Sequence, residues 1–217
     1  MNFNPAIFAL WVLPFLIAVV FHEWAHGYVA KTLGDDTASV LGRLTLNPLA
    51  HIDPIGTLAL PALLMLTGAP FMFGWAKPVP ISFGRLRNPR RDMVLVAAAG
   101  PAMNLALAAA SALLLGYMQR RGAPDGGGFQ VAQPLAIMCN MSLQLNVVLA
   151  VFNMLPIPPL DGGRVAVGLL PRDLAWQLAR LEPYGFMIVM MLLVTHVLDF
   201  VLAPAMHAIV RLLGVLV

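Results

Sequence analysis

Long apolar runs separated by short polar stretches dominate the chain. The first extends from about Pro5 to Leu33, and two others cover Met93–Met118 and Pro134–Leu155. Each approaches or exceeds the roughly 20 residues that a helix needs to cross a bilayer. The residues from Pro183 onward are also mostly apolar, with Pro204 near their middle, and they predict two short spans. The pattern predicts an all-α polytopic membrane protein with about 5–6 membrane segments.

The apolar segment from Ile55 to Phe73 does not fit a single crossing. Lys31 precedes it, and a basic cluster follows it between positions 77 and 91. Because Lys and Arg gather in cytosolic loops, both flanks should be cytosolic and the N-terminus should lie outside. We therefore expect a re-entrant segment or a broken pair. Such backbone survives at membrane depth only when it is buried in protein or lines a wet cavity.

Composition narrows the class of protein. Of the 217 residues, 60% are hydrophobic and 11% are charged, whereas soluble domains carry about 25% charged residues. We expect one membrane domain over residues 1–217, with a core at about 5–170 and accessory helices at about 183–217. The net charge of +3 is spread along membrane edges and does not favour nucleic acid. The first run lacks the basic flank and cleavage site of a signal peptide, so we expect none to be removed.

Ionisable residues stand at the end of the first apolar run, which reads FHEWAHGYVAK from 21 to 31. On a helix, His22 and His26 share one face, so both imidazoles can reach one metal ion, while Glu23 can hold a water. Burying such groups near hydrocarbon costs several kcal/mol without partners. The pattern predicts a zinc site with Glu23 as general base. The alternative is a polar cluster that closes the helix end.

A catalytic zinc ion needs a third protein ligand. Thr32 stands where the extended pattern of soluble proteases would place another histidine. The acidic candidates near the cytosolic edge are Asp35, Asp36, Asp53 and Asp161. Asp161 follows three prolines that break the preceding helix at membrane depth, so its carboxylate could project into a cavity. It could equally cap the next helix, and spacing alone leaves both interpretations open.

Three motifs in combination resemble the site-2 proteases, which are intramembrane zinc metalloproteases. They are HEWAH at 22–26, GPAMN at 100–104 and NMLPIPPLDGG at 153–163. The resemblance implies that His22, His26 and Asp161 hold one zinc ion and that Glu23 is the base. It also implies that Asn153 binds substrate or stabilises the developing oxyanion. An asparagine in a membrane helix can instead form a hydrogen bond to another helix.

The segment GWAKPVPISFG, at 74–84, resembles the extended membrane-associated loop of that family. Pro78 and Pro80 exclude a helix there, and alternate residues could present a strand edge to a substrate. This makes Trp75 and Lys77 candidates for substrate binding. The alternative is an ordinary loop at the membrane surface.

Two further residues could support the zinc site. His51 begins the region expected to be re-entrant and could reach the ligands from below. The alternative is a histidine at the membrane surface that has no chemical role. Asn104, in the GPAMN motif, could bond a neighbouring helix or position the loop near zinc.

The resemblance implies an enzyme that hydrolyses a peptide bond within or near the transmembrane segment of a single-pass membrane protein. It implies a bacterial or archaeal cell membrane, with the active site towards the cytosol. The short loop after Met118 leaves no room for a PDZ domain, and no nucleotide-sensing domain is visible, so we expect a short form. The alternatives are a zinc-binding transporter and a non-catalytic scaffold of the same fold. Charged groups clustered at one end disfavour the transporter, and an intact Glu23 disfavours the scaffold.

Overall fold

The computed structural model describes residues 5–67, 74–120 and 132–214. Within these ranges it is helical, with four helices long and apolar enough to cross a membrane. They are α1 (Pro5–Thr32), α4 (Pro89–Arg120), α5 (Ala132–Asn153) and α9 (Val197–Gly214). α7 (Arg172–Ala179) and α8 (Glu182–Val194) are bent by 69° and together would form a fifth span. The predicted all-α polytopic fold is confirmed, while most of the predicted external loop at 119–130 lies outside the described residues.

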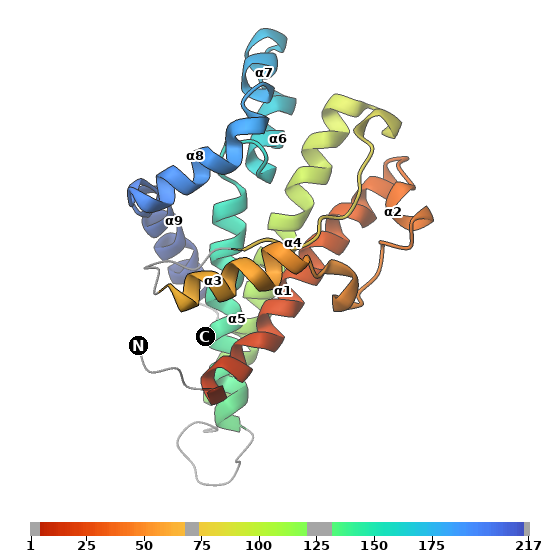
Figure 1. Cartoon of the computed structure of the whole chain (residues 1–217). Coiled ribbons are helices and arrows are strands. Elements are labelled where there is room, and N and C mark those ends of the chain that lie inside the picture. The colour runs from red at the N-terminus through yellow and green to blue at the C-terminus, as the bar shows by residue number, and fades with distance from the viewer. Residues whose placement is uncertain (1–4, 68–73, 121–131, 215–217) are drawn as a thin grey trace.

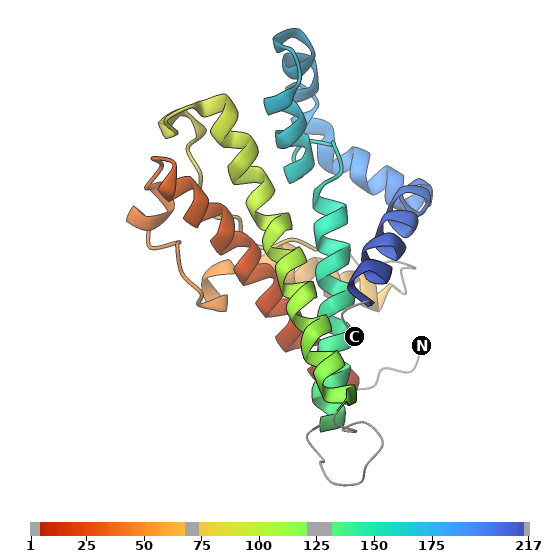
Figure 2. The ribbon, with the colours of Figure 1, turned by 180° about the vertical axis from the view of Figure 1, so that it is seen from behind.

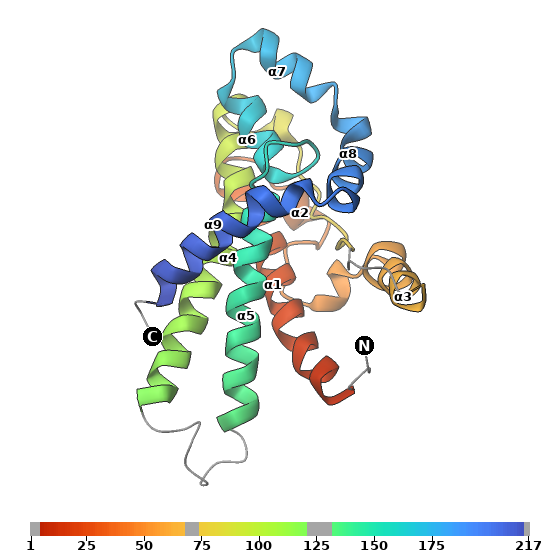
Figure 3. The same ribbon diagram turned by 90° about the vertical axis from the view of Figure 1, so that its left-hand side faces the viewer.

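Helices α1, α4 and α5 form the central bundle, as Figures 1 and 2 show. Ala108 and Ala112 of α4 pack against Leu143 and Val147 of α5. Small side chains let two helix backbones approach closely, which favours association in a membrane. Helix α9 packs against α5 and α4 and crosses them obliquely, whereas α3 lies away from both (Figure 3).

The segment expected to be re-entrant is a short broken helix. A π-helical turn at Pro54–Ala59 continues into α3 (Leu60–Leu66), and residues 68–73 lie outside the described part of the chain. The Asp53 carboxylate caps the start by accepting the backbone N–H groups of Ile55 and Gly56 at 3.0 Å and 2.7 Å. A helix of this length cannot cross a bilayer alone, so a re-entrant path remains our prediction.

The two predicted C-terminal segments are present as α8 and α9, but Pro204 does not divide them. The chain turns at His196, whose φ of 58° places it in the left-handed region, and Pro204 lies inside α9. Internal prolines are tolerated in membrane helices because neighbouring groups satisfy the freed backbone atoms. A sequence pattern that relies on proline therefore misplaces this break.

Residues 74–82, which lie between α3 and α4 in the chain, form an extended segment that contains no helix or strand. The N–H groups of Trp75, Lys77 and Val79 all donate inward, in the alternation expected of extended backbone. The first two donate to the carbonyl oxygens of Gly56 and His51, at 3.1 Å and 2.9 Å. Short helices complete the fold: α2 (Thr37–Val40), α6 (Asp161–Leu169) and the 3-10 turns Pro48–His51 and Phe83–Arg85.

Candidate metal centre

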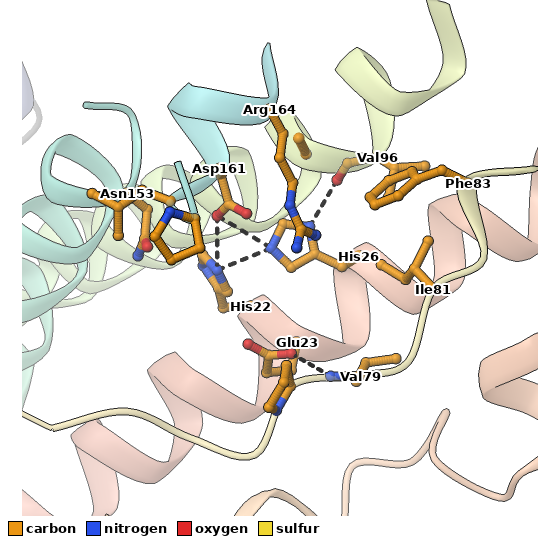
Figure 4. Close-up of a pocket in the computed structure, with 14 residues that line it drawn as sticks. His22, Glu23, His26, Val79, Ile81, Phe83, Val96, Asn153, Asp161 and Arg164 are labelled. Carbon is orange, nitrogen blue, oxygen red and sulfur yellow. Dashed lines mark hydrogen bonds and ion pairs between the residues drawn. The ribbon is translucent and has the colours of Figure 1, made fainter. Parts of the chain in front are cut away.

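Two helices bring three potential metal ligands together part-way along α1 and α4, beside the C-terminal end of α5. His22 and His26 come from α1, Asp161 comes from the first turn of α6, and all three point toward one another in Figure 4. The Nε2 atoms of the histidines are 3.0 Å apart, and Asp161 Oδ2 lies 3.2 Å and 3.3 Å from them. Two ligands on one tetrahedral zinc ion are about 3.3–3.6 Å apart, given bonds of about 2.0–2.2 Å. The observed distances of 3.0–3.3 Å lie at or slightly below this range, so the three atoms are close enough to share one zinc ion.

The outer nitrogens of both rings are already used. His22 Nδ1 is 2.5 Å from Asn104 Oδ1, and His26 Nδ1 is 2.7 Å from the carbonyl oxygen of Val96. Because both partners are acceptors, each Nδ1 carries the proton and donates it. A neutral imidazole then presents a bare lone pair on Nε2, which is the state that binds a metal.

The centre also has an unsatisfied oxygen and a space of the right size. Asp161 Oδ2 is buried and has no assigned hydrogen-bond donor, although it lies within 3.3 Å of both Nε2 atoms. A Cβ added to Gly100 would lie 2.6 Å from His22 Nε2 and closer still to that of His26. Because position 100 is glycine, this volume is left open beside the ligand atoms. A cation there would satisfy the buried carboxylate oxygen.

Asp161 does not cap α6. The N-cap position is Leu160, no side chain caps this helix, and Asp161 is its first helical residue. The chain reaches this point through a tight loop, because Gly162 and Gly163 pack directly on the backbone of residues 154–158. A side chain at either glycine would collide with that backbone. The loop thus turns the Asp161 carboxylate toward α1, and of the two interpretations left open by the sequence, the geometry favours the metal ligand.

Glu23 lies beside the histidines, on the wall of a cavity of about 170 Å³. Its Oε2 accepts the backbone N–H of Val79 at 2.8 Å. This hydrogen bond ties the extended segment to α1 at the position of the predicted base, as Figure 4 shows. Asn153 and Arg164 line the same cavity.

Asn153 is the last residue of α5 and is half-buried. Its Nδ2 donates to the carbonyl oxygen of Leu149, one turn earlier in the same helix, at 3.0 Å. An amide nitrogen carries two hydrogens, so this bond uses one of them. Asn153 therefore lies at the cavity, and one hydrogen of its side-chain amide is bonded within its own helix.

The structure places the other candidates away from the cavity wall. Trp75 packs edge-on against Phe186 of α8, with ring centroids 5.8 Å apart. Lys77 is exposed. His51 is buried, but its Nε2 donates to the carbonyl oxygen of Thr45 at 2.9 Å, and its own carbonyl holds Lys77. These residues thus shape or hold the extended segment. The predicted roles of Trp75 and Lys77 toward substrate, and of His51 toward the zinc ligands, stay predictions.

Sequence reasoning did not single out two residues that the structure places near the ligands. Arg164 lies over the ring of Phe83, 5.1 Å from its centroid, and 3.8 Å from a carboxylate oxygen of Glu182. Asn146 is buried and bonds to Asn104. A signal for Asn146 was present, because an amide inside an apolar spanning helix is costly without a partner.

Comparison with known proteins assigns the family. The family model of peptidase family M50 matches residues 10–195 of this chain. The chain is 40% identical over 197 residues to "Putative zinc metalloprotease YwhC" of Bacillus subtilis. The aligned residues make up 91% of this chain and 85% of that relative. It is 33% identical over 193 residues to "Putative zinc metalloprotease Rip2" of Mycolicibacterium smegmatis, at 89% and 70% coverage. No solved structure gives a significant match. The chain therefore belongs to peptidase family M50, the site-2 proteases, as an integral membrane zinc metalloprotease.

Proposed function

We propose that this protein hydrolyses a peptide bond within or beside the transmembrane segment of single-pass membrane proteins, with the active site towards the cytosol. The single observation that carries this is the convergence of His22, His26 and Asp161 within a bundle of membrane helices. The three residues are proposed as the zinc ligands. Glu23 lies beside them on a shared cavity, which supports hydrolysis rather than metal storage.

Each side chain has a distinct part in the proposed reaction. Zinc, when bound, supplies Lewis acidity that polarises a carbonyl group and lowers the pKa of water. Glu23 takes the proton of the attacking water and delivers it to the leaving amine. Because Val79 N–H holds Oε2, we assign the water to Oε1. Asn153 Nδ2 donates to the carbonyl oxygen as negative charge develops on it, which requires its amide to turn toward the cavity.

The extended segment at 74–82 supports a substrate that is unwound into a strand. Peptide bonds in a helix are shielded, so a transmembrane substrate must unwind before hydrolysis, and pairing with extended backbone would satisfy its exposed groups. The edge opposite to the inward-donating groups contains Pro78 and Pro80, which lack an N–H. That edge would hold a substrate through carbonyl oxygens that accept the substrate's N–H groups, and the carbonyl oxygen of Pro78 would do so beside Arg43, which already donates to it at 3.3 Å.

Cleavage of a single-pass membrane protein in detergent tests the proposal, with zinc content measured on the same samples. Glu23→Gln should retain zinc and lose cleavage, because an amide cannot accept the proton of water. Asp199→Asn is the matched control, since it makes the same chemical change at an exposed position on α9. Equal cleavage by wild type and Glu23→Gln would overturn the proposal. Zinc uptake into proteoliposomes would instead support the transporter.

A further inference from the structure

A chain of hydrogen bonds leads from the candidate metal centre into the middle of the bundle. His22 bonds to Asn104 of α4, and Asn104 Nδ2 donates to Asn146 Oδ1 of α5 at 2.8 Å. Asn146 Nδ2 donates to the hydroxyl of Ser142 at 3.2 Å, and Ser142 accepts from Ser111 at 2.9 Å. Both asparagines have 0% exposure. Polar groups so deeply buried are costly unless every hydrogen bond is made.

Two backbone carbonyl groups fix the direction of this chain. Asn104 Nδ2 also donates to the carbonyl oxygen of Ala18 at 3.2 Å, and Asn146 Nδ2 donates to that of Ser142 at 2.8 Å. A carbonyl oxygen can only accept, so each anchor requires the nitrogen of its amide to face it. Asn146 therefore presents its oxygen to Asn104, and Asn104 presents its oxygen to His22.

Rotation of the Asn104 amide by 180° would undo the zinc-binding state of His22. Its nitrogen would then face His22 Nδ1, which could accept only without a proton, and the proton would move to Nε2. Nε2 is the atom aimed at Asp161 and His26. A protonated Nε2 has no lone pair to offer a metal.

The two histidines differ in how firmly their tautomer is held. His26 donates to the backbone carbonyl of Val96, which cannot rotate within α4. His22 depends on the side-chain amide of Asn104, which is held by two acceptors, Asn146 Oδ1 at 2.8 Å and the carbonyl oxygen of Ala18 at the longer distance of 3.2 Å. We infer that Asn146 is a positioning residue for zinc binding: as the nearer of these two acceptors, it helps to hold the amide that keeps the proton on His22 Nδ1. The inference rests on the proposed ligand set.

Zinc affinity, measured by competition with a chelator, tests the inference. Asn146→Leu removes the acceptor at similar side-chain size and should weaken zinc binding about tenfold, as loss of outer hydrogen-bond partners does. Asn146→Ala is measured alongside in case leucine disturbs folding. Val147→Ala is the matched control, because it removes volume at the next, equally buried position of α5 and leaves the amide chain intact.

The decisive comparison repeats Asn146→Leu in an Asn104→Asp background. A carboxylate offers only acceptors to His22, so its rotation no longer matters, and we expect Asn146→Leu to cost no further affinity there. An equal loss in both backgrounds would mean that Asn146 supports the helix packing alone. Unchanged zinc affinity in both single variants at position 146 would also overturn the inference. If the proposed ligand set is wrong, His22→Ala will retain its zinc in full, and this result distinguishes that failure from failure of the present inference.

Discussion

Gly100 is the residue that leaves room for the metal. A methyl group at this position would stand where the Nε2 atoms of His22 and His26 converge. Gly100→Ala should therefore weaken zinc binding by more than the roughly 10–100-fold that loss of an outer hydrogen bond costs. Gly84→Ala is the control, because a Cβ there meets nothing within 4 Å. Chelator competition measures both, and normal zinc affinity in Gly100→Ala would place the metal elsewhere.

Asn153 allows binding and catalysis to be separated at a single residue. Its amide lines the cavity, and the hydrogen bond it donates goes to the carbonyl oxygen of Leu149 rather than to one of the three proposed ligands. Asn153→Ala should lower kcat by about 10²–10³, as removal of one oxyanion donor does in other hydrolases, while zinc content stays unchanged. Steady-state cleavage kinetics and metal analysis measure the two effects. A normal kcat would assign Asn153 to helix structure alone.

At the scale of the elements, the extended segment is anchored by two carboxylates of the α1 region. Glu23 holds Val79, and Asp35 accepts the backbone N–H of Ser82 at 2.6 Å. Asp35 also accepts both the backbone N–H and the hydroxyl of Thr37. Burial alone would raise the pKa of Asp35, but these hydrogen bonds, with the charge of Arg85, hold its pKa below the usual value.

The lowered pKa of Asp35 gives the segment a pH dependence with a definite sign. The anchor's contribution is fully present above the ordinary pKa of an aspartate, near 3.9, and is lost as pH falls through the lowered value. Asp35→Asn should reduce the stability of this segment at neutral pH by about 1.5–3 kcal/mol. Hydrogen exchange of residues 74–82 measures this, as about 10–100-fold faster exchange. The difference from wild type should shrink as pH falls below the ordinary aspartate pKa, and a difference that grows in acid would contradict the assignment.

Some elements could be predicted from the sequence and others could not, and the difference has a physical cause in each case. α1, α4 and α5 follow from apolar length, because a bilayer demands about 20 such residues. The turn at His196 could not be found, because a left-handed non-glycine residue carries no clear local signature. Asn104 was expected to bond a neighbouring helix, but Asn146 could not be identified as its partner, because the pairing depends on which faces of α4 and α5 meet.

The candidate site was predictable where one helix carries it. His22, Glu23 and His26 follow from spacing on α1, since residues four apart share a face. Asp161 could not be assigned by spacing, because its approach depends on a loop whose glycines pack on backbone. The contact between Glu23 and Val79 involves a backbone N–H, which no residue pattern specifies.

At the scale of the whole molecule, the basic cluster between positions 77 and 91 predicts which end of the bundle faces the cytosol. Arg91 stands near the start of α4, at the end that carries α6, and Gln119 stands at the opposite end. Cys139 is the single cysteine of the sequence, so Cys139→Ala gives a cysteine-free background. In it, Gln119→Cys should react with a membrane-impermeant thiol reagent from outside intact cells. Arg91→Cys should react only after permeabilisation. The reverse pattern would place the candidate site on the outer side.

The most direct test of the central claim is the zinc content of purified wild type, His22→Ala and Asp161→Ala. The ligands come from two helices that are far apart in sequence, so both variants should lose the metal if they form one site. We predict about one zinc per chain in wild type and much less in each variant. Full zinc content in Asp161→Ala would contradict the three-ligand centre, and no zinc in wild type would contradict the hydrolytic account as a whole.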